Sequence, residues 1–237
     1  MTEPPEKTTI HDMSVHDAIH GLRATRIFED REIPGPILDQ ILEAATMACS
    51  SGNTQPWEFV VVVDPEVKKR LKAEMVEGFA AIDRERVQAK EDLVDGAGRA
   101  VTGHAAVENM ETVGAIVVVC WNPDRGIRFA GEYEENPDGS LTEIREMPGG
   151  RGVSLFQACQ NMMLAARSFG VQSLFTTFFF LRQREIKEIL GIPPRIFMEC
   201  AVFLGYGEEK LGRPRRLPVP EVTHLDHWDQ PYGPSDG

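Results

Sequence analysis

The sequence predicts a single domain, residues 14–237, built from both helices and strands. Three apolar runs of strand length, at 59–63, 114–120 and 197–204, indicate buried strands, and segments with helical periodicity lie between them. No shift in composition marks a linker. A chain of 237 residues with 42% hydrophobic and 26% charged residues has an ordinary globular composition and can bury a sizeable core.

Two helices are expected before the first strand. Ser14 is a suitable N-cap, because its hydroxyl can accept a hydrogen bond from the first helical turn, where Asp17 also lies. The polar residues 1–13 are interpreted as a flexible N-terminal tail. A second helix is predicted to begin near Pro36, since proline is favoured at the first helical position.

The middle of the chain is expected to be more variable. Asp64 and Pro65 signal the start of a third helix. Residues 80–112 are more polar and contain glycines, which favours helices broken by a mobile connector. Within 121–150, the turn signal Asn136-Pro137-Asp138-Gly139 predicts a short hairpin.

The last third of the chain is predicted to contain the most apolar helix and an extended tail. That helix covers 153–169 and is expected to be largely buried. Gly170 is expected to end it, as the residue just beyond the last helical turn. A shorter helix is predicted at 183–190. Residues 212–237 are rich in proline and arginine without apolar periodicity, so this tail is either disordered or laid along another surface.

Charge and cysteine content exclude several classes of protein. A net charge of −12 argues against nucleic-acid binding, which needs a basic face, but local arginines can still bind a small anion. No apolar run is long enough for a membrane span, and the polar N-terminus carries no secretory signal. The four cysteines lack metal-site spacing, and Cys120, Cys159 and Cys200 lie in apolar stretches as expected for reduced thiols. We therefore expect a cytoplasmic protein without a metal site.

The most informative stretch is the loop from Cys49 to Trp57, which joins a helix to a strand. Asn53 and Gln55 each offer a donor and an acceptor, which suits the edge of a heterocycle. Gly52 lets the backbone approach a ligand closely. A polar connector without function would also have this composition, so the loop needs support from other parts of the chain.

That support comes from arginines near both ends of the chain. Arg23 and Arg26 either share a helix face or converge on one ligand if the chain turns there. Arg213, Arg215 and Arg216 follow Gly212. Motifs for a nucleophilic serine, a zinc protease, a P-loop or a dinucleotide fold are absent from the sequence. The combination suits a bound phosphorylated heterocycle that supplies its own reactivity.

Several blocks together resemble the FMN-dependent nitroreductase family, over residues 14–64 and 105–228. The blocks, in family order, are Arg23-Ala24-Thr25-Arg26-Ile27-Phe28, Ser50-Ser51-Gly52-Asn53-Thr54-Gln55-Pro56-Trp57, Gln160-Asn161-Met162-Met163, Gly170, Gly205-Tyr206 and Arg215-Arg216. The resemblance implies an α+β fold with a central mixed, mainly antiparallel sheet flanked by helices. It also implies an intertwined homodimer whose C-terminal tail is exchanged onto the partner, with one FMN at each of two subunit interfaces.

The resemblance further implies which residues contact the flavin. Arg23 and Arg26 would contact FMN, the latter near the pyrimidine edge, while Arg216, with Arg215 as the near alternative, would bind the 5′-phosphate. The loop residues would reach the partner subunit's flavin, and a threonine turn would approach flavin N5 through its backbone. The complete set of expected cofactor contacts is Arg23, Ala24, Thr25, Arg26, Cys49, Ser50, Asn53, Gln55, Thr176, Thr177, Arg215 and Arg216.

The implied activity is electron transfer from NADH or NADPH, through FMN, to a small oxidised acceptor such as a nitroaromatic or a quinone. The mechanism expected is ping-pong, with no side chain required as acid or base and with the protein supplying position and electrostatics. Three alternatives remain open at the level of sequence. They are other flavin chemistry on the same scaffold, such as dehalogenation or flavin breakdown, a flavin-binding protein without turnover, and a dimeric interaction domain.

Overall fold

A computed structural model describes residues 13–88, 103–125, 131–146, 152–207, 212, 214 and 216–233. The predicted N-terminal tail up to residue 12, part of the predicted connector, Arg213 and Arg215 lie outside them.

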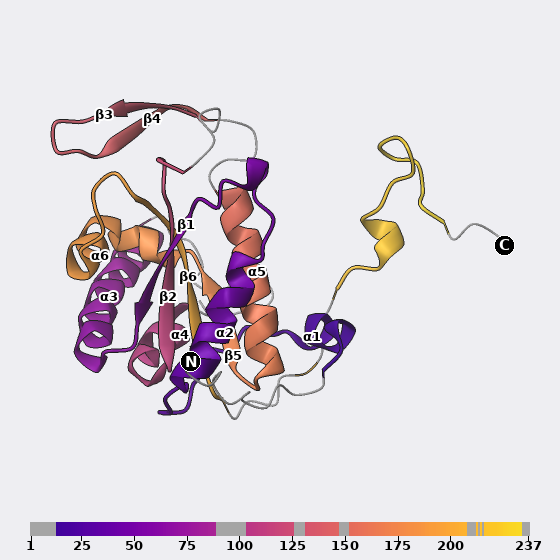
Figure 1. The fold of residues 1–237 in the computed structure, drawn as a ribbon, viewed down its shortest axis with the longest axis horizontal. Helices are drawn as coiled ribbons and strands as arrows, with labels where there is room; N and C mark the ends of the chain where they lie inside the picture. Colours follow the sequence, from indigo (N-terminus) through magenta and orange to yellow (C-terminus); the bar gives the residue numbers. More distant parts are fainter. Residues whose placement is uncertain are drawn as a thin grey trace, which may run out of the picture.

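The core of the molecule is a four-stranded antiparallel sheet with the strand order β1-β2-β6-β5 (Figure 1). The strands are β1 (Trp57–Val62), β2 (Ala115–Trp121), β5 (Gln172–Thr176) and β6 (Phe197–Gly205). β1 and β5 are the edge strands of the sheet. The resemblance implied a mixed sheet, but in the described residues the parallel pairing is one isolated bridge, between Ala24 and Ser173 beside β5.

Helices cover both faces of this sheet. Figure 1 shows α2 (Gly35–Thr46) and α5 (Gly152–Ser168) on one side, and α3 (Pro65–Gln88), α4 (Gly103–Glu108) and α6 (Gln183–Leu190) on the other. The two faces form two separate hydrophobic clusters. Along β2, Ile116 and Val118 face the α3 side while Val117 and Val119 face the α5 side. A strand covered on both faces is apolar at every position, which explains its continuous apolar run.

The predicted helix ends depend on local signals, and the structure confirms them. The Ser14 hydroxyl accepts a hydrogen bond from the Asp17 N–H at the start of α1 (Val15–Gly21). The Asp64 carboxylate accepts from two N–H groups at the start of α3. Gly170 follows α5 with a φ of 72°, and α6 has the predicted bounds. Because caps act within a few residues, they can be read without knowledge of the fold.

The middle of the chain contains helices and a hairpin, as predicted. α3 continues to Gln88 and α4 follows at Gly103–Glu108, while the predicted connector between them lies outside the described residues. The hairpin is present as β3 (Gly131–Glu135) and β4 (Leu141–Glu146), a two-stranded sheet separate from the main one. Its turn lies at the predicted Asn-Pro-Asp-Gly sequence, where Gly139 has a φ of 77°.

α5 is less buried than predicted. Its inner face contributes Leu155, Ala158 and Met162 to the core, but Val153 and Phe156 are each 45% exposed. Gln160 faces solvent. The half-buried Asn161 side chain donates a 3.3 Å hydrogen bond to the Ala44 carbonyl and so links α5 to α2. An apolar surface on one side of the helix remains without a covering layer.

The C-terminal tail, which includes the short helix η4 (Val219–Glu221), stands away from the rest of the molecule in Figure 1. Its large apolar side chains are exposed by 44–80%, with Trp228 at the upper limit. These exposed residues are Leu217, Val219, Val222, Leu225, Trp228 and Tyr232. Apolar side chains exposed along such a segment are unfavourable in water.

Candidate functional site

The predicted site segment beginning at Arg23 lies against the edge strand β5. The Thr25 N–H donates to the Ser173 carbonyl at 3.0 Å, and the Thr25 hydroxyl donates to the Gln172 side-chain oxygen at 2.7 Å. The Gln172 amide nitrogen donates in turn to the Gly207 carbonyl at 2.8 Å. Gln172 therefore joins the N-terminal segment, the start of β5 and the chain that leaves β6.

A cleft of about 390 Å³ opens beside this junction. It lies between α1, the C-terminal end of α5 and the start of β5. Its lining is mostly polar and consists of Asp17, His20, Gly21, Leu22, Arg23, Thr25, Arg167, Val171, Gln172 and Ser173.

Arg23 connects the cleft to the base of the C-terminal tail. Its Nε donates to the Gly212 carbonyl at 2.7 Å, and its Nη1 donates to the His20 carbonyl at 3.0 Å. Arg216 follows Gly212 by four residues, so the two Cα atoms are at most about 14 Å apart along an extended chain. The predicted gathering of Arg23 with the arginine segment of the tail is therefore compatible with the chain path.

Two buried polar atoms of residues that line the cleft have no hydrogen-bond partner within the described chain, Nε of Arg167 and Oγ of Ser173. Ser173 is only 2% exposed. Buried donors are nearly always paired, because an unpaired one costs about 1–3 kcal/mol. The oxygen atoms of an anionic group in the cleft could accept hydrogen bonds from both donors.

The amide-rich loop has an unusual backbone. Asn53 and Gln55 have φ angles of 54° and 48°, a left-handed conformation that is uncommon outside glycine. The Ser50 hydroxyl accepts a 3.0 Å hydrogen bond from the Gln55 N–H, and the Gln55 amide donates to the Asn53 side-chain oxygen at 3.3 Å. Cys49, Asn53 and Gln55 are exposed. Strain held by internal hydrogen bonds, with amides facing outward, is common at binding sites.

The amide loop and the arginine cleft lie at opposite corners of the sheet. The loop leads into the start of β1 on one edge, whereas Thr25 bonds to the start of β5 on the other edge. The first residue of β1 lies beside the last residue of β2 and the first residue of β6. The first residue of β5 lies beside the last residue of β6, which is at the opposite end of the sheet. A seven-residue strand is about 24 Å long, and the edge strands are about 14 Å apart. One protomer therefore does not bring the two groups together.

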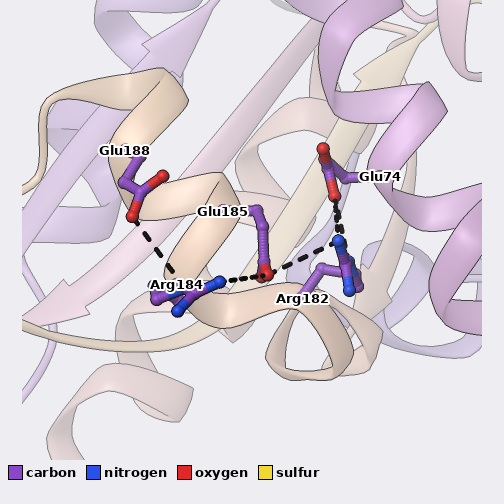
Figure 2. A network of polar contacts seen from close by, with 5 residues as sticks. All are labelled: Glu74, Arg182, Arg184, Glu185 and Glu188. Atoms are coloured by element: carbon purple, nitrogen blue, oxygen red, sulfur yellow. Dashed lines mark hydrogen bonds and ion pairs between the residues drawn. The ribbon is translucent and has the colours of Figure 1, made fainter.

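The predicted threonine turn lies at the far end of β5 from Arg23. Thr176 ends β5 and Thr177 follows it, and the Thr176 hydroxyl accepts a 3.2 Å hydrogen bond from the Phe178 N–H. The next segment, η3 (Phe178–Arg182), is fixed by the ion pairs in Figure 2, in which Arg182 lies between Glu74 of α3 and Glu185 of α6. The turn is thus held on a rigid support.

The cysteines form no disulfide bond in the described part of the chain. Cys120, Cys159 and Cys200 are buried and unbridged, as predicted. Burial raises the pKa of Cys120 to about 12, and a contact with Cys159 together with burial raises the pKa of Cys200. The thiols of Cys120 and Cys200 therefore stay protonated at neutral pH and are poor nucleophiles. No group of three potential metal ligands occurs in the part of the chain that the structure describes.

The structure therefore places the predicted site residues that it describes in four regions, which are the cleft, the amide loop, the threonine turn and the tail with Arg216. Arg23, Ala24 and Thr25 lie at the cleft, and Arg26 donates a 3.3 Å hydrogen bond to the Ala24 carbonyl beside it. The loop residues and the threonine turn lie elsewhere. Arg167, Gln172 and Ser173 were not predicted. The only sequence signal was a single arginine in the last turn of an apolar helix, which is also a common helix-end residue.

The residues present fit FMN as a ligand. The cleft supplies guanidinium groups and a buried hydroxyl for a phosphate, and the outward amides of the loop suit a heterocycle. Fold and site together describe an α+β protein with an anion cleft at the edge of an antiparallel sheet. The chain belongs to the nitroreductase family, a family of oxidoreductase enzymes, whose model matches residues 19–206.

Individual relatives agree with this assignment. The chain is 28% identical over 230 residues to a protein of Methanothermobacter thermautotrophicus provisionally named NADH dehydrogenase/NAD(P)H nitroreductase, covering 94% of this chain and 95% of that protein. A shorter match, 34% identical over 77 residues, covers 32% of this chain and 27% of iodotyrosine deiodinase 1 of Sus scrofa. Among solved structures, the NADPH:FMN oxidoreductase of Vibrio harveyi complexed with NAD+ shares the fold, with a TM-score of 0.66, 19% identity and coverage of 91% and 78%.

No helix in the described part of the chain is both long enough and apolar enough to cross a membrane.

Proposed function

We propose that this chain is an FMN-dependent oxidoreductase that passes electrons from NADH or NADPH to a small oxidised acceptor, such as a nitroaromatic or a quinone, by a ping-pong mechanism. The observation that carries the proposal is the arginine-lined cleft of a nitroreductase-family chain, with two buried donors that lack a partner. Reduced buried thiols support a cytoplasmic location.

Each predicted contact has a physical role in this proposal. FMN, when bound, supplies the redox chemistry by accepting electrons from the nicotinamide and giving them to the acceptor. Arg23 and Arg216 would hold the 5′-phosphate through charge-assisted hydrogen bonds. Arg26 would place positive charge beside the pyrimidine edge, where negative charge develops on reduction. The backbone at Thr176 and Thr177 would approach N5, and the ion pair of Arg182 with Glu74 supports the segment that follows this turn.

We further propose that the active form is a homodimer in which each flavin contacts both subunits. The amide loop lies at the opposite corner of the sheet from Arg23, so a second copy has to supply it. The exposed apolar side chains of the tail and of α5 provide a surface for that second copy. The tail is proposed to lie along the partner, where its apolar residues become buried.

A visible absorption spectrum and a steady-state assay test the main proposal. The purified protein is expected to be yellow or to become yellow when FMN is added, and to oxidise NADH or NADPH when a quinone or nitroaromatic is present. A protein that stays colourless with added FMN contradicts the proposal. A yellow protein without turnover would instead be a flavin-binding protein.

Complementation between two inactive variants tests the shared site. Arg23→Met and Asn53→Ala are each expected to lose most activity, because each damages a different half of every site. In a mixture reassociated after mild denaturation, half of the dimers contain one of each chain and have one intact site, so activity recovers to about a quarter of wild type. If no activity returns although mixed dimers form, both halves belong to the same subunit.

Reductive dehalogenation is a second candidate, favoured by the local similarity to iodotyrosine deiodinase 1. It uses the same cofactor and differs only in the acceptor. Halide release from an iodinated phenol at a rate comparable to quinone reduction would favour it over the first candidate.

A further inference from the structure

Arg167 and Ser173 line the cleft, but the predicted flavin contacts leave them without a role. The Arg167 Nε and the Ser173 hydroxyl are the two buried side-chain polar atoms without a partner in the described residues, and both residues line one cleft. Two unrelated defects at one place would be an unusual coincidence, because buried unpaired donors are rare. A shared missing partner accounts for both.

The position of Arg167 is set by a close approach that only glycine permits. A Cβ at Gly21 would lie 2.0 Å from Nη2 of Arg167, so the guanidinium packs directly against the last residue of α1. An arginine in the last turn of a helix is favourable for the helix dipole, and α5 has this arrangement. The interaction with the helix dipole explains why a positively charged residue lies in the last turn of α5. It does not explain why the Arg167 side chain lies across Gly21 with its Nε buried.

The charges around the cleft favour a strongly anionic ligand. Arg23 and Arg167 line it, and the tail segment that carries Arg216 begins at the Arg23 contact with Gly212. The one carboxylate in the lining, Asp17, accepts a 2.6 Å hydrogen bond from the Ser14 hydroxyl. Several arginines near one cleft are notable in a chain with a net charge of −12. Guanidinium groups with a hydroxyl are a typical donor set for phosphate.

We infer that Arg167 and Ser173 complete, with Arg23, a binding site for a phosphate monoester. The Arg167 guanidinium, held in place by Gly21, donates to the phosphate oxygens from the α5 side of the cleft. The Ser173 hydroxyl turns between staggered rotamers to donate from the β5 side. The ester is either the 5′-phosphate of FMN, in which case the inference rests on the proposed function, or that of a separate phosphorylated ligand.

Comparison of FMN with riboflavin tests the first source, because the two flavins differ only in the phosphate. In titrations followed by flavin fluorescence, Arg167→Met is expected to weaken FMN about tenfold while changing riboflavin less than about twofold. Arg167→Lys keeps the charge and is expected to recover part of the loss. Arg184→Met, at a site whose side chain is 82% exposed in α6, is the matched control. Equal losses for both flavins would overturn the assignment of the FMN phosphate.

Inorganic phosphate tests the site without any flavin. Millimolar phosphate is expected to raise the melting temperature of the full chain in flavin-free buffer above that in sodium chloride of equal ionic strength. The rise should be lost in Arg167→Met and kept in Arg184→Met. A phosphate effect that survives in Arg167→Met overturns the site. If the chain binds no flavin but shows the Arg167-dependent effect, the proposed function fails while the phosphate site stands.

Two further variants separate binding from folding. Ser173→Ala removes an unpaired buried hydroxyl, so the protein without ligand is expected to melt at the same or a higher temperature while its phosphate response falls. Gly21→Ala displaces the guanidinium without removing its charge and should weaken FMN as Arg167→Met does. An Arg167→Met variant that keeps its phosphate response but dissociates into monomers would contradict the inference, and would identify a partner carboxylate as the ligand of Arg167.

Discussion

Two groups of arginines in this molecule have opposite surroundings. In Figure 2, Arg182 lies between two carboxylates, with Nη2 2.8 Å from Glu74 and 3.4 Å from Glu185, and Arg184 contacts Glu185 and Glu188. At the cleft, Arg23 donates to the backbone carbonyls of Gly212 and His20, and the Arg167 Nε has no hydrogen-bond partner in the described part of the chain. The first group contacts protein carboxylates, whereas Arg167 leaves a buried donor without a partner.

This difference separates a structural cluster from a binding site. A hydrogen bond to Glu74 raises the pKa of Arg182, and the network joins α3, η3 and α6 into one unit. In a chain with excess negative charge, carboxylates were available to neutralise every arginine. Arg167 instead packs against Gly21 and keeps its buried Nε unpaired in the described residues, so that donor remains open to the proposed ligand. The comparison makes three predictions.

The largest expected effect comes from Arg23→Met. FMN affinity should fall about 100-fold, because the substitution removes a charge-assisted contact and also the bond that holds the tail base at Gly212. Equilibrium titration with FMN measures the change. A loss as large in Arg182→Met would show that the two groups of arginines do not differ in function.

Only some of the structural features and candidate site residues could be predicted from the sequence. Helix caps such as Ser14 and Asp64 and the buried strand β2 could be predicted, because they depend on local residues or on one periodicity. Arg23 could be proposed as a contact because it stands in a recognisable block. Arg167 and Ser173 could not be proposed from the sequence, because they come together only when α1, α5 and β5 meet at one cleft.

Features that depend on surroundings were also the ones predicted wrongly. α5 was expected to be largely buried because of its composition, yet its Val153 and Phe156 side remains uncovered. Composition does not reveal which neighbour covers a helix, and the neighbour of this side is proposed to be a second subunit.

The second prediction concerns stability without binding. Arg182→Met should lower the melting temperature by a few degrees, since it leaves Glu74 and Glu185 without their shared cation. FMN affinity should change by less than about threefold. Arg184→Met, which removes only contacts of an 82% exposed side chain, should leave the melting temperature nearly unchanged. Thermal melts of the three proteins, with and without FMN, provide the measurement.

The smallest effect is a pH dependence that belongs to the Glu74–Arg182–Glu185 network alone. A backbone hydrogen bond, and then the charges of Arg182 and Arg184, hold the pKa of Glu185 below its ordinary value of 4.5. A carboxylate with a lowered folded-state pKa stabilises the fold fully above its ordinary pKa and loses that effect as pH falls through the lowered value. The melting-temperature difference between wild type and Arg182→Met should therefore be constant above pH 4.5 and shrink below it. A difference that persists unchanged in acid would mean that Arg182 stabilises the fold by packing against Gly78 rather than by charge, since its side chain also lies 3.1 Å from the Cβ position there.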